Sequence, residues 1–299
     1  MNRIGTLLPI LGFSCFVFVI WKYFDYGEVW ECLKKAKSFI IILVIILTSI
    51  QIFTATLRYK FFLKACGTQI KTSDCMSAVL TALSLNSLLP GKSGDLVKGI
   101  VLTKEKDDIL KFSGVTMIEK LCDLSILSVI TFIGSVLVNN SFWQFLSLTA
   151  FIIFICSMFS FRYANQLPII GGKLQILPDI ILSICKNRIF FLYGIFFCIL
   201  LWIINLLIIY LLFIAVDANV SASEIISYWP SSMLTGMLPI TISGFGTRDA
   251  AFIYAIGESL NNTKLFAGTF LYTVFVYWFL SILAFLILVI KCAINLRSK

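Results

Sequence analysis

Three groups of charged residues interrupt long apolar stretches of the sequence, and their types and spacing could do chemistry. The groups are Lys92, Asp95 and Lys98; Glu119, Lys120 and Asp123; and Arg248 and Asp249. A charged side chain inside a membrane-spanning segment is costly, and by default it marks a substrate or ion pathway. We therefore treat all three groups as candidate binding residues.

The first and third groups each lie beside a predicted break in a helix. The residues at these breaks are Pro90, Gly91 and Gly94 in the first stretch, and Pro239, Gly244 and Gly246 in the second. Asn86, shortly before the first break, is a further candidate binding residue. Proline ends a helix and glycine permits a tight turn, so a half-helix is expected to begin after each break. The free N–H groups at a helix start bind anions, and Lys92 and Arg248 add positive charge there. This combination predicts a site for a phosphate or phosphodiester, which arginine can bind in a bidentate way.

The first and third groups also contain a carboxylate shortly after a cation. Asp95 and Asp249 could each cap the start of a half-helix, or pair with the neighbouring Lys or Arg. In a simpler interpretation, the first group is a short cytoplasmic loop and the third is an interfacial ion pair that only locks the fold.

The second group lies in the first half of a long predicted helix. Glu119 and Asp123 are four residues apart and share one helix face, whereas Lys120 points elsewhere. The two carboxylates could pair with Lys92 or Arg248, or bind the amine of a cationic substrate. In the simpler interpretation, this group marks a helix start at the level of the lipid headgroups.

Metal and cofactor chemistry has little support in the sequence. It contains no histidine, which removes the commonest general base and the commonest metal ligand. The nine cysteines form no Cys-x-x-Cys pair, and most lie in apolar runs, where they are expected to act as small hydrophobic residues. We therefore predict no metal site and no cofactor.

The composition is that of a protein embedded in a membrane. Of the 299 residues, 60% are hydrophobic and only 13% are charged, whereas soluble domains carry about 25% charged residues. The net charge of +9 is explained by basic cytoplasmic loops and anionic lipid headgroups. We therefore predict membrane lipids as partners and no binding of nucleic acid.

Charge-free windows of about 20 residues predict the membrane spans. Six full spans are expected, at residues 4–21, 38–57, 109–138, 142–161, 189–216 and 265–290. Residues 25–37 are predicted to form an interfacial amphipathic helix, and residues around 177–184 a surface-lying helix. Two shorter and more polar segments, 75–91 and 225–247, are predicted to enter the membrane, break and continue as half-helices.

The order of these segments repeats along the chain. Residues 1–140 and 141–299 each contain a span, a second span, a broken pair and a third span, and the two halves would have opposite orientations in the membrane. This is the inverted-repeat plan of many secondary transporters. The predicted fold is an all-α polytopic membrane protein, a single membrane domain of residues 1–299. It has about six full transmembrane helices plus two broken or re-entrant helix pairs in an inverted 3+3 repeat.

The distribution of Lys and Arg predicts the orientation of the chain. With the N-terminus inside, the inner loops hold fifteen of these residues and the outer loops five. Arg58 is counted among the inner residues, directly after the second predicted span. The positive-inside rule then places both termini in the cytoplasm, and we expect a multi-pass protein of a prokaryotic plasma (inner) membrane.

These motifs together resemble a known family, the lysylphosphatidylglycerol synthase transmembrane region, also called flippase-like or UPF0104 membrane proteins. The first motif is matched by Asn86, Pro90, Gly91, Gly94, Asp95 and Lys98; the second by Glu119, Lys120 and Asp123; the third by Pro239, Gly244, Gly246 and Arg248. Lys98 and Lys120 stand where the family usually has Arg, and Asp249 replaces Glu. Because Lys cannot make the bidentate contact of Arg, the headgroup preference of the family is left open here.

The resemblance implies lipid handling. Some family members are described as moving aminoacylated phosphatidylglycerol between leaflets, and others are associated with hopanoid, polyprenyl-sugar or cell-envelope pathways. We expect a flippase-like lipid transporter for a phospholipid of the aminoacylated phosphatidylglycerol type, or for a polyprenyl-phosphate-linked headgroup. We expect no synthase domain and no enzymatic activity.

Two alternatives remain open. One is a membrane transferase acting on a lipid phosphate, with Asp95 or Glu119 as its base. The other is a non-catalytic partner of a cell-envelope glycosyltransferase or synthase. The identity of the lipid, the direction and energy source of transport, and the oligomeric state do not follow from the sequence.

Overall fold

The computed structural model describes residues 26–87, 89, 93–103, 108–160, 176–237, 241, 244–257 and 262–297. These residues form helices joined by short turns, and no strand occurs among them. The predicted first span at 4–21 lies outside the described residues, as do Pro90, Gly91, Lys92 and Pro239.

Among the residues that the structure describes, five helical segments are long and apolar enough to cross a membrane: Ser38–Ala65, Ile109–Leu137, Ser141–Ser160, Arg188–Ala215 and Asn262–Lys291. They belong to α3 (Ser38–Ala65), α6 (Asp108–Leu137), α7 (Ser141–Ser160), α10 (Arg188–Ala215), and a continuous run of α13 (Asn262–Tyr272), the π-helical η3 (Thr273–Phe279) and α14 (Leu280–Arg297). At about 1.5 Å per residue, even the shortest covers about 30 Å, the thickness of the hydrocarbon core. The prediction of an all-α polytopic membrane protein is confirmed.

Both predicted short helices are present. α2 (Tyr26–Lys34) precedes α3, and α9 (Ile176–Lys186) precedes α10. α2 has Glu28 in its first turn and Lys34 in its last turn, which suits the positive and negative ends of the helix dipole.

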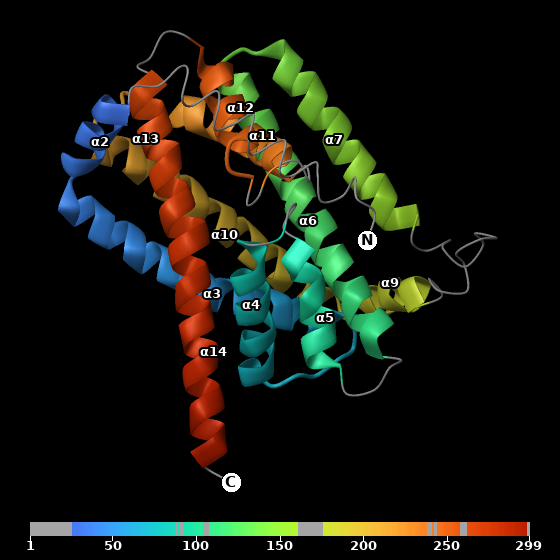
Figure 1. Cartoon of the computed structure of the whole chain (residues 1–299). Helices are drawn as coiled ribbons and strands as arrows, with labels where there is room; N and C mark the ends of the chain where they lie inside the picture. Colours follow the sequence, from blue (N-terminus) through green and yellow to red (C-terminus); the bar gives the residue numbers. More distant parts are fainter. Residues whose placement is uncertain are drawn as a thin grey trace, which may run out of the picture.

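Both predicted helix breaks are also present. α4 (Thr72–Asn86) ends before the 3-10 turn η1 (Ser93–Leu96) and the short helix α5 (Val97–Leu102). α11 (Ala222–Gly236) ends before α12 (Thr247–Ile256). In Figure 1, α4 and α5 lie toward the lower end of the molecule and α11 and α12 toward the upper end. The two broken elements therefore lie toward opposite ends.

Glycine is required where each broken chain turns back on itself. A Cβ atom on Gly94 would lie 2.7 Å from Asn86 Oδ1, and one on Gly244 would lie 2.7 Å from the Gly236 carbonyl oxygen. Gly244 also has a φ of 70°, which side-chain-bearing residues rarely adopt. In both breaks, therefore, the returning chain packs directly on the last turn of the preceding helix.

Equivalent helix boundaries in the two halves are separated by the same number of residues. Tyr26 and Ile176 begin a short helix, Ala65 and Ala215 end a long one, and Asn86 and Gly236 end a broken one. The second residue of each pair lies 150 positions after the first, as 215 follows 65 and 236 follows 86. The helix starts at Ser38 and Arg188, at Thr72 and Ala222, and at Val97 and Thr247 keep the same interval.

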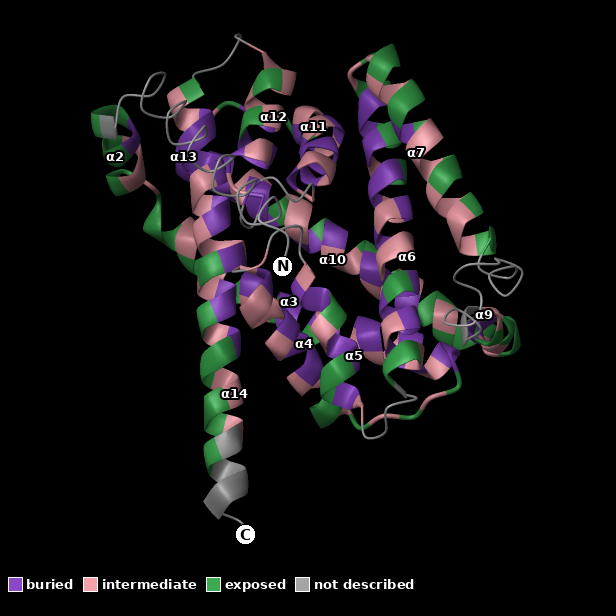
Figure 2. Cartoon of the chain, turned by 45° about the vertical axis from the view of Figure 1, so that its right-hand side comes forward, coloured by how far each residue is buried: buried purple, intermediate pink, exposed green. Residues whose placement is uncertain are grey.

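The central helices α3 and α10 pack against each other, and the remaining helices pack around them. α11 packs on α6, and α14 packs on α4. Among the described helices, α7 makes its extensive contacts with α6. Buried residues face the centre of the molecule, whereas the outer face of α7 is exposed (Figure 2). Exposed apolar residues on α3, α7 and α10, such as Phe53, Phe145 and Phe196, suit a surface that faces lipid.

The predicted end of the second span is wrong. α3 continues past residue 57 to Ala65, and Arg58 lies inside it with only 8% of its surface exposed. In sequence analysis, a cation normally marks the end of a predicted membrane span. Arg58 does not end the helix, because carboxylates of α6 pair with it. Arg58 therefore belongs to the interior and not to a cytoplasmic loop.

Candidate functional site

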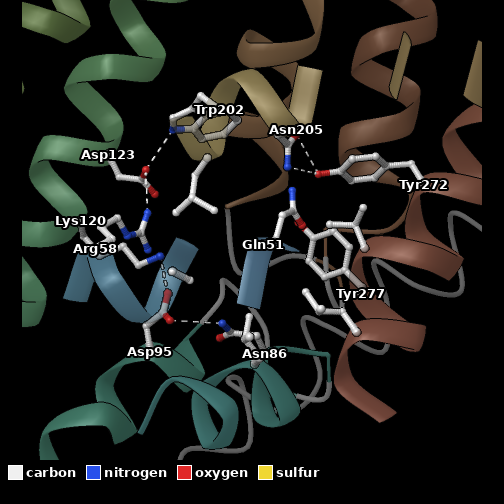
Figure 3. Close-up of a pocket in the computed structure, with 15 residues that line it drawn as sticks. Gln51, Arg58, Asn86, Asp95, Lys120, Asp123, Trp202, Asn205, Tyr272 and Tyr277 are labelled. Carbon is white, nitrogen blue, oxygen red and sulfur yellow. Dashed lines mark hydrogen bonds and ion pairs between the residues drawn. The ribbon is translucent and has the colours of Figure 1, made fainter. Parts of the chain in front are cut away.

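A cavity of about 140 Å³ lies between the central helices. At roughly 30 Å³ per molecule, this volume holds about four or five waters. Its wall includes Gln51, Ala55 and Arg58 of α3, Trp202 and Asn205 of α10, and Asn86 at the end of α4 (Figure 3). Asp95, Lys120 and Asp123 line one side, and Tyr272 and Tyr277 the other. The cavity therefore draws on both halves of the chain and lies beside the first helix break.

Arg58 lies between two carboxylates of α6. Its Nη2 is 2.6 Å from Glu119 Oε1, and its Nη1 is 3.1 Å from Asp123 Oδ1. Glu119 is fully buried. The spacing of four residues that places Glu119 and Asp123 on one helix face thus produces a two-sided clamp for a guanidinium group.

Two lysines complete the network. Lys98 Nζ is 3.2 Å from Asp95 Oδ1 and 3.1 Å from Glu119 Oε2. Lys120 forms an ion pair with Asp95, and the Asn86 amide donates to Asp95 Oδ1 at 3.3 Å. We call Arg58, Asp95, Lys98, Glu119, Lys120 and Asp123 the ion network. Its three cations balance its three carboxylates, which offsets the cost of burying charge.

The network brings together most of the sequence-predicted residues, with different partners from those expected. Glu119 pairs with Arg58 and Lys98, and Asp123 pairs with Arg58, whereas Arg248 pairs with Asp249. Lys120, which was expected to point elsewhere, reaches Asp95. A lysine can do so because its stem is long enough to extend along the helix surface before the ammonium group turns. Lys92 lies outside the described residues.

Arg248 lies in a separate cluster. The residue is fully buried, and its Nη2 is 2.6 Å from Asp249 Oδ1 and 2.5 Å from Thr273 Oγ1. Asp249 also accepts a hydrogen bond from the Gly246 N–H at 2.9 Å, so it ties the cation to the start of α12. We call Arg248, Asp249 and the rings around the guanidinium the arginine cage.

Three aromatic rings surround the guanidinium group of Arg248. Its Cζ lies 4.8 Å from the ring centroid of Tyr272, 5.3 Å from Trp229 and 5.4 Å from Tyr277. These distances are those of cation–π contacts. Tyr272 and Tyr277 line the cavity, whereas Arg248 does not. The structure thus places the third charged group behind the aromatic wall of the cavity, held by its neighbour Asp249.

Polar residues of α10 connect the two clusters. Trp202 Nε1 donates to Asp123 at 2.9 Å. One turn further on, Asn205 Nδ2 donates to the Tyr272 hydroxyl at 2.8 Å, and Trp229 Nε1 donates to Asn205 Oδ1 at 3.3 Å. The hydrogen bonds therefore extend from α6 across α10 to the arginine cage.

The sequence analysis missed Gln51, Arg58, Trp202 and Asn205. Gln51 and Arg58 are seven residues apart and share one face of α3, and Asn205 is a polar residue inside the apolar span 189–216. These signals were available, because a polar side chain within a span tends to face the protein interior. The sequence analysis missed Arg58 because the predicted span stopped at residue 57, directly before it.

A multi-pass membrane protein with a charge-balanced polar interior is the class that this fold and site define. The chain belongs to the lysylphosphatidylglycerol synthase TM region family, which matches residues 7–284. This membership makes it a lipid-related membrane protein and confirms the predicted family.

Two relatives from archaea match most of the chain. A UPF0104 membrane protein of Methanocaldococcus jannaschii is 26% identical over 282 residues, which cover 83% of this chain and 83% of the relative. A UPF0104 membrane protein of Methanothermobacter thermautotrophicus is 22% identical over 288 residues, covering 85% of each chain.

Proposed function

We propose that this protein is a flippase-like lipid transporter. It moves a phospholipid of the aminoacylated phosphatidylglycerol type, or a polyprenyl-phosphate-linked lipid, between the leaflets of the membrane. The observation that carries the proposal is the cavity between α3 and α10, which is walled by the ion network. The headgroup enters this cavity, while the acyl or prenyl chains stay in the surrounding lipid.

The broken helices support a transport role. Interrupted backbone at membrane depth is stable only where protein covers it or where it lines a cavity. In many secondary transporters, such helices from two halves meet at the substrate site, and the halves rock around it. Here Asn86, at the end of α4, and Asp95, in η1, both line the cavity.

Blocking the cavity after folding tests this function. In a background without native cysteines, Ala55→Cys would place a thiol in the cavity wall, and a bulky maleimide would then fill the space. We expect movement of a fluorescent phospholipid in proteoliposomes to fall to the rate of protein-free liposomes. Ile50→Cys, on the same helix but 44% exposed, should keep its rate after the same labelling.

Two outcomes would contradict transport. The first is an unchanged rate after labelling of Ala55→Cys. The second is a rate equal to that of protein-free liposomes for the unlabelled protein with every lipid offered. Mass analysis of the recovered lipid covers the transferase alternative, since a chemically altered lipid would favour an enzyme. Movement that requires a co-purified envelope enzyme would favour a partner role.

A further inference from the structure

Two buried polar atoms at the cavity have no hydrogen-bond partner among the described residues. They are Arg58 Nε, a donor, and Asn86 Oδ1, an acceptor. Each of these residues is only 8% exposed, and both line the cavity. An unpaired buried polar atom costs about 1–3 kcal/mol. Both atoms are themselves buried, and Asn86 Oδ1 lies 2.7 Å from where a Cβ on Gly94 would stand, so they are packed within the wall and do not face the space of the cavity.

The amide of Gln51, by contrast, is available to a ligand in the cavity. Gln51 lines the cavity from α3 and is 6% exposed, and its side chain makes no hydrogen bond within the described part of the chain. In Figure 3 its amide points into the space between Asn205 and Tyr277. An amide offers both a donor and an acceptor, so this side of the wall also suits a group that does both.

The charges of the wall argue against a charged ligand in the cavity. Arg58 and Lys120, the cations in the described part of the wall, are already paired with carboxylates. A phosphate would be drawn close to Asp95 and Asp123, and an ammonium group close to Arg58 and Lys120. Either ligand would add an uncompensated charge to a buried, balanced network, which is costly.

We propose that the cavity binds the uncharged, hydroxyl-bearing part of a lipid headgroup, such as a sugar or a glycerol. A hydroxyl can exchange hydrogen bonds with the Gln51 amide, which offers both a donor and an acceptor, and it adds no charge. The apolar face of such a group packs on the rings of Trp202, Tyr272 and Tyr277, which line the same cavity. The lipid phosphate stays outside the ion network.

This inference rests on the proposed function only for the claim that the ligand is a lipid. Both lipid classes proposed above carry hydroxyl groups beside their phosphate. The aminoacyl group of an aminoacylated lipid would bring an ammonium group, for which the cavity has no unpaired carboxylate among its described residues. Of the two lipid classes proposed above, the inference therefore favours the polyprenyl-phosphate-linked one with a hydroxyl-bearing headgroup over the aminoacylated one.

Three probes that share an octyl chain and differ in their headgroup test the inference. The full-length protein is held in a polymer without hydroxyl groups and titrated with octyl glucoside, octyl phosphate or octylammonium, each below its micelle concentration. Binding is measured from the rise in unfolding temperature. We expect octyl glucoside to bind at least about tenfold more tightly than either charged probe, the ratio that 1.4 kcal/mol represents. Free glucose should bind more weakly than octyl glucoside, because it has no alkyl chain to contact the apolar surface of the protein.

Gln51→Leu provides the matched variant. It removes an amide that has no internal partner, so the fold should be retained. We expect affinity for octyl glucoside to fall about tenfold, as one lost hydrogen bond predicts. Gln144→Leu is the same substitution on α7, where the amide donates to the Ser135 carbonyl oxygen outside the cavity, and it should bind octyl glucoside as the wild type does.

Several results would overturn the inference. Octyl phosphate or octylammonium binding as tightly as octyl glucoside would do so, as would unchanged glucoside affinity in Gln51→Leu. Equal affinity for free glucose would overturn the assignment to a lipid headgroup. If the protein binds octyl glucoside but moves no lipid, the transport function is contradicted and the hydroxyl-binding site is supported. If it moves lipid but shows no preference for hydroxyl groups, transport is supported and the hydroxyl-binding site is contradicted.

Discussion

Arg58 is the residue on which the ion network depends most. Its guanidinium group contacts Glu119 and Asp123 together, at 2.6 and 3.1 Å. Arginine suits this position because its planar group can bond two carboxylates at once, which a lysine ammonium group does less well. Lys98 then needs to satisfy only the second oxygen of Glu119 and the adjacent Asp95.

The Arg58→Ala substitution should destabilise the protein by about 3–5 kcal/mol, because it leaves buried carboxylates without their cation. Lys34→Ala removes a cation from an exposed pair with Glu31 and should cost less than about 1 kcal/mol. Denaturant unfolding in detergent measures both. Equal losses for the two variants would show that the network contributes no more than a surface ion pair.

At the scale of the helix, the break before α12 depends on close packing. Gly244 and Gly257 both have positive φ values, of 70° and 82°. A Cβ atom on Gly244 would lie 2.7 Å from a backbone oxygen, whereas one on Gly257 would meet nothing within 4 Å. The two glycines therefore share backbone strain and differ in available space.

Alanine substitution separates these two effects. Gly257→Ala should cost about 1–3 kcal/mol from the backbone alone, because a φ of 82° with a ψ of −177° is a conformation that glycine adopts almost exclusively. Gly244→Ala should cost about 1–3 kcal/mol more, because the chain must move away from α11. Thermal unfolding compares the two variants, and equal losses would mean that the break tolerates a shift away from α11.

Local sequence signals predicted the elements better than the contacts between them. Proline, glycine and polar residues in a short apolar segment locate both breaks, and charge-free windows locate the spans. The sequence left the partners of Arg248 open, and only the packed structure places Asp249, Thr273 and three rings around it. Arg58 was misassigned for the same reason, since its partners are 61 and 65 residues away, at positions 119 and 123.

At the scale of the whole molecule, the two halves are proposed to be inverted copies. The interval of 150 positions between equivalent helix ends supports this. The contacts also match: α11, the counterpart of α4, packs on α6, and α14, part of the counterpart of α6, packs on α4. In this register, Arg248 corresponds to Lys98, and Thr273 corresponds to Asp123. Each half therefore contains a cation at the equivalent position, but the partners differ: Lys98 contacts Asp95 and Glu119, whereas Arg248 contacts Asp249 and Thr273.

Opposite orientation of the halves can be measured directly. Lys35→Cys, just after α2, and Lys186→Cys, at the end of α9, are made in a background without native cysteines. With the N-terminus in the cytoplasm, we expect an impermeant maleimide to label the first from outside intact cells. The second should be labelled only after the membrane is opened. Labelling of both from one side would contradict the inverted arrangement and the predicted topology.

The constant interval between helix ends also has an evolutionary consequence. Two inverted halves imply an ancestor of half this length that inserted into the membrane in both directions and paired with itself. Such an ancestor would have had two equal cation clusters. After such a fusion, one copy would have kept acidic partners on a neighbouring helix, whereas the other would have surrounded its cation with rings and paired it with the adjacent Asp249. The ion network and the arginine cage would then be two descendants of one motif.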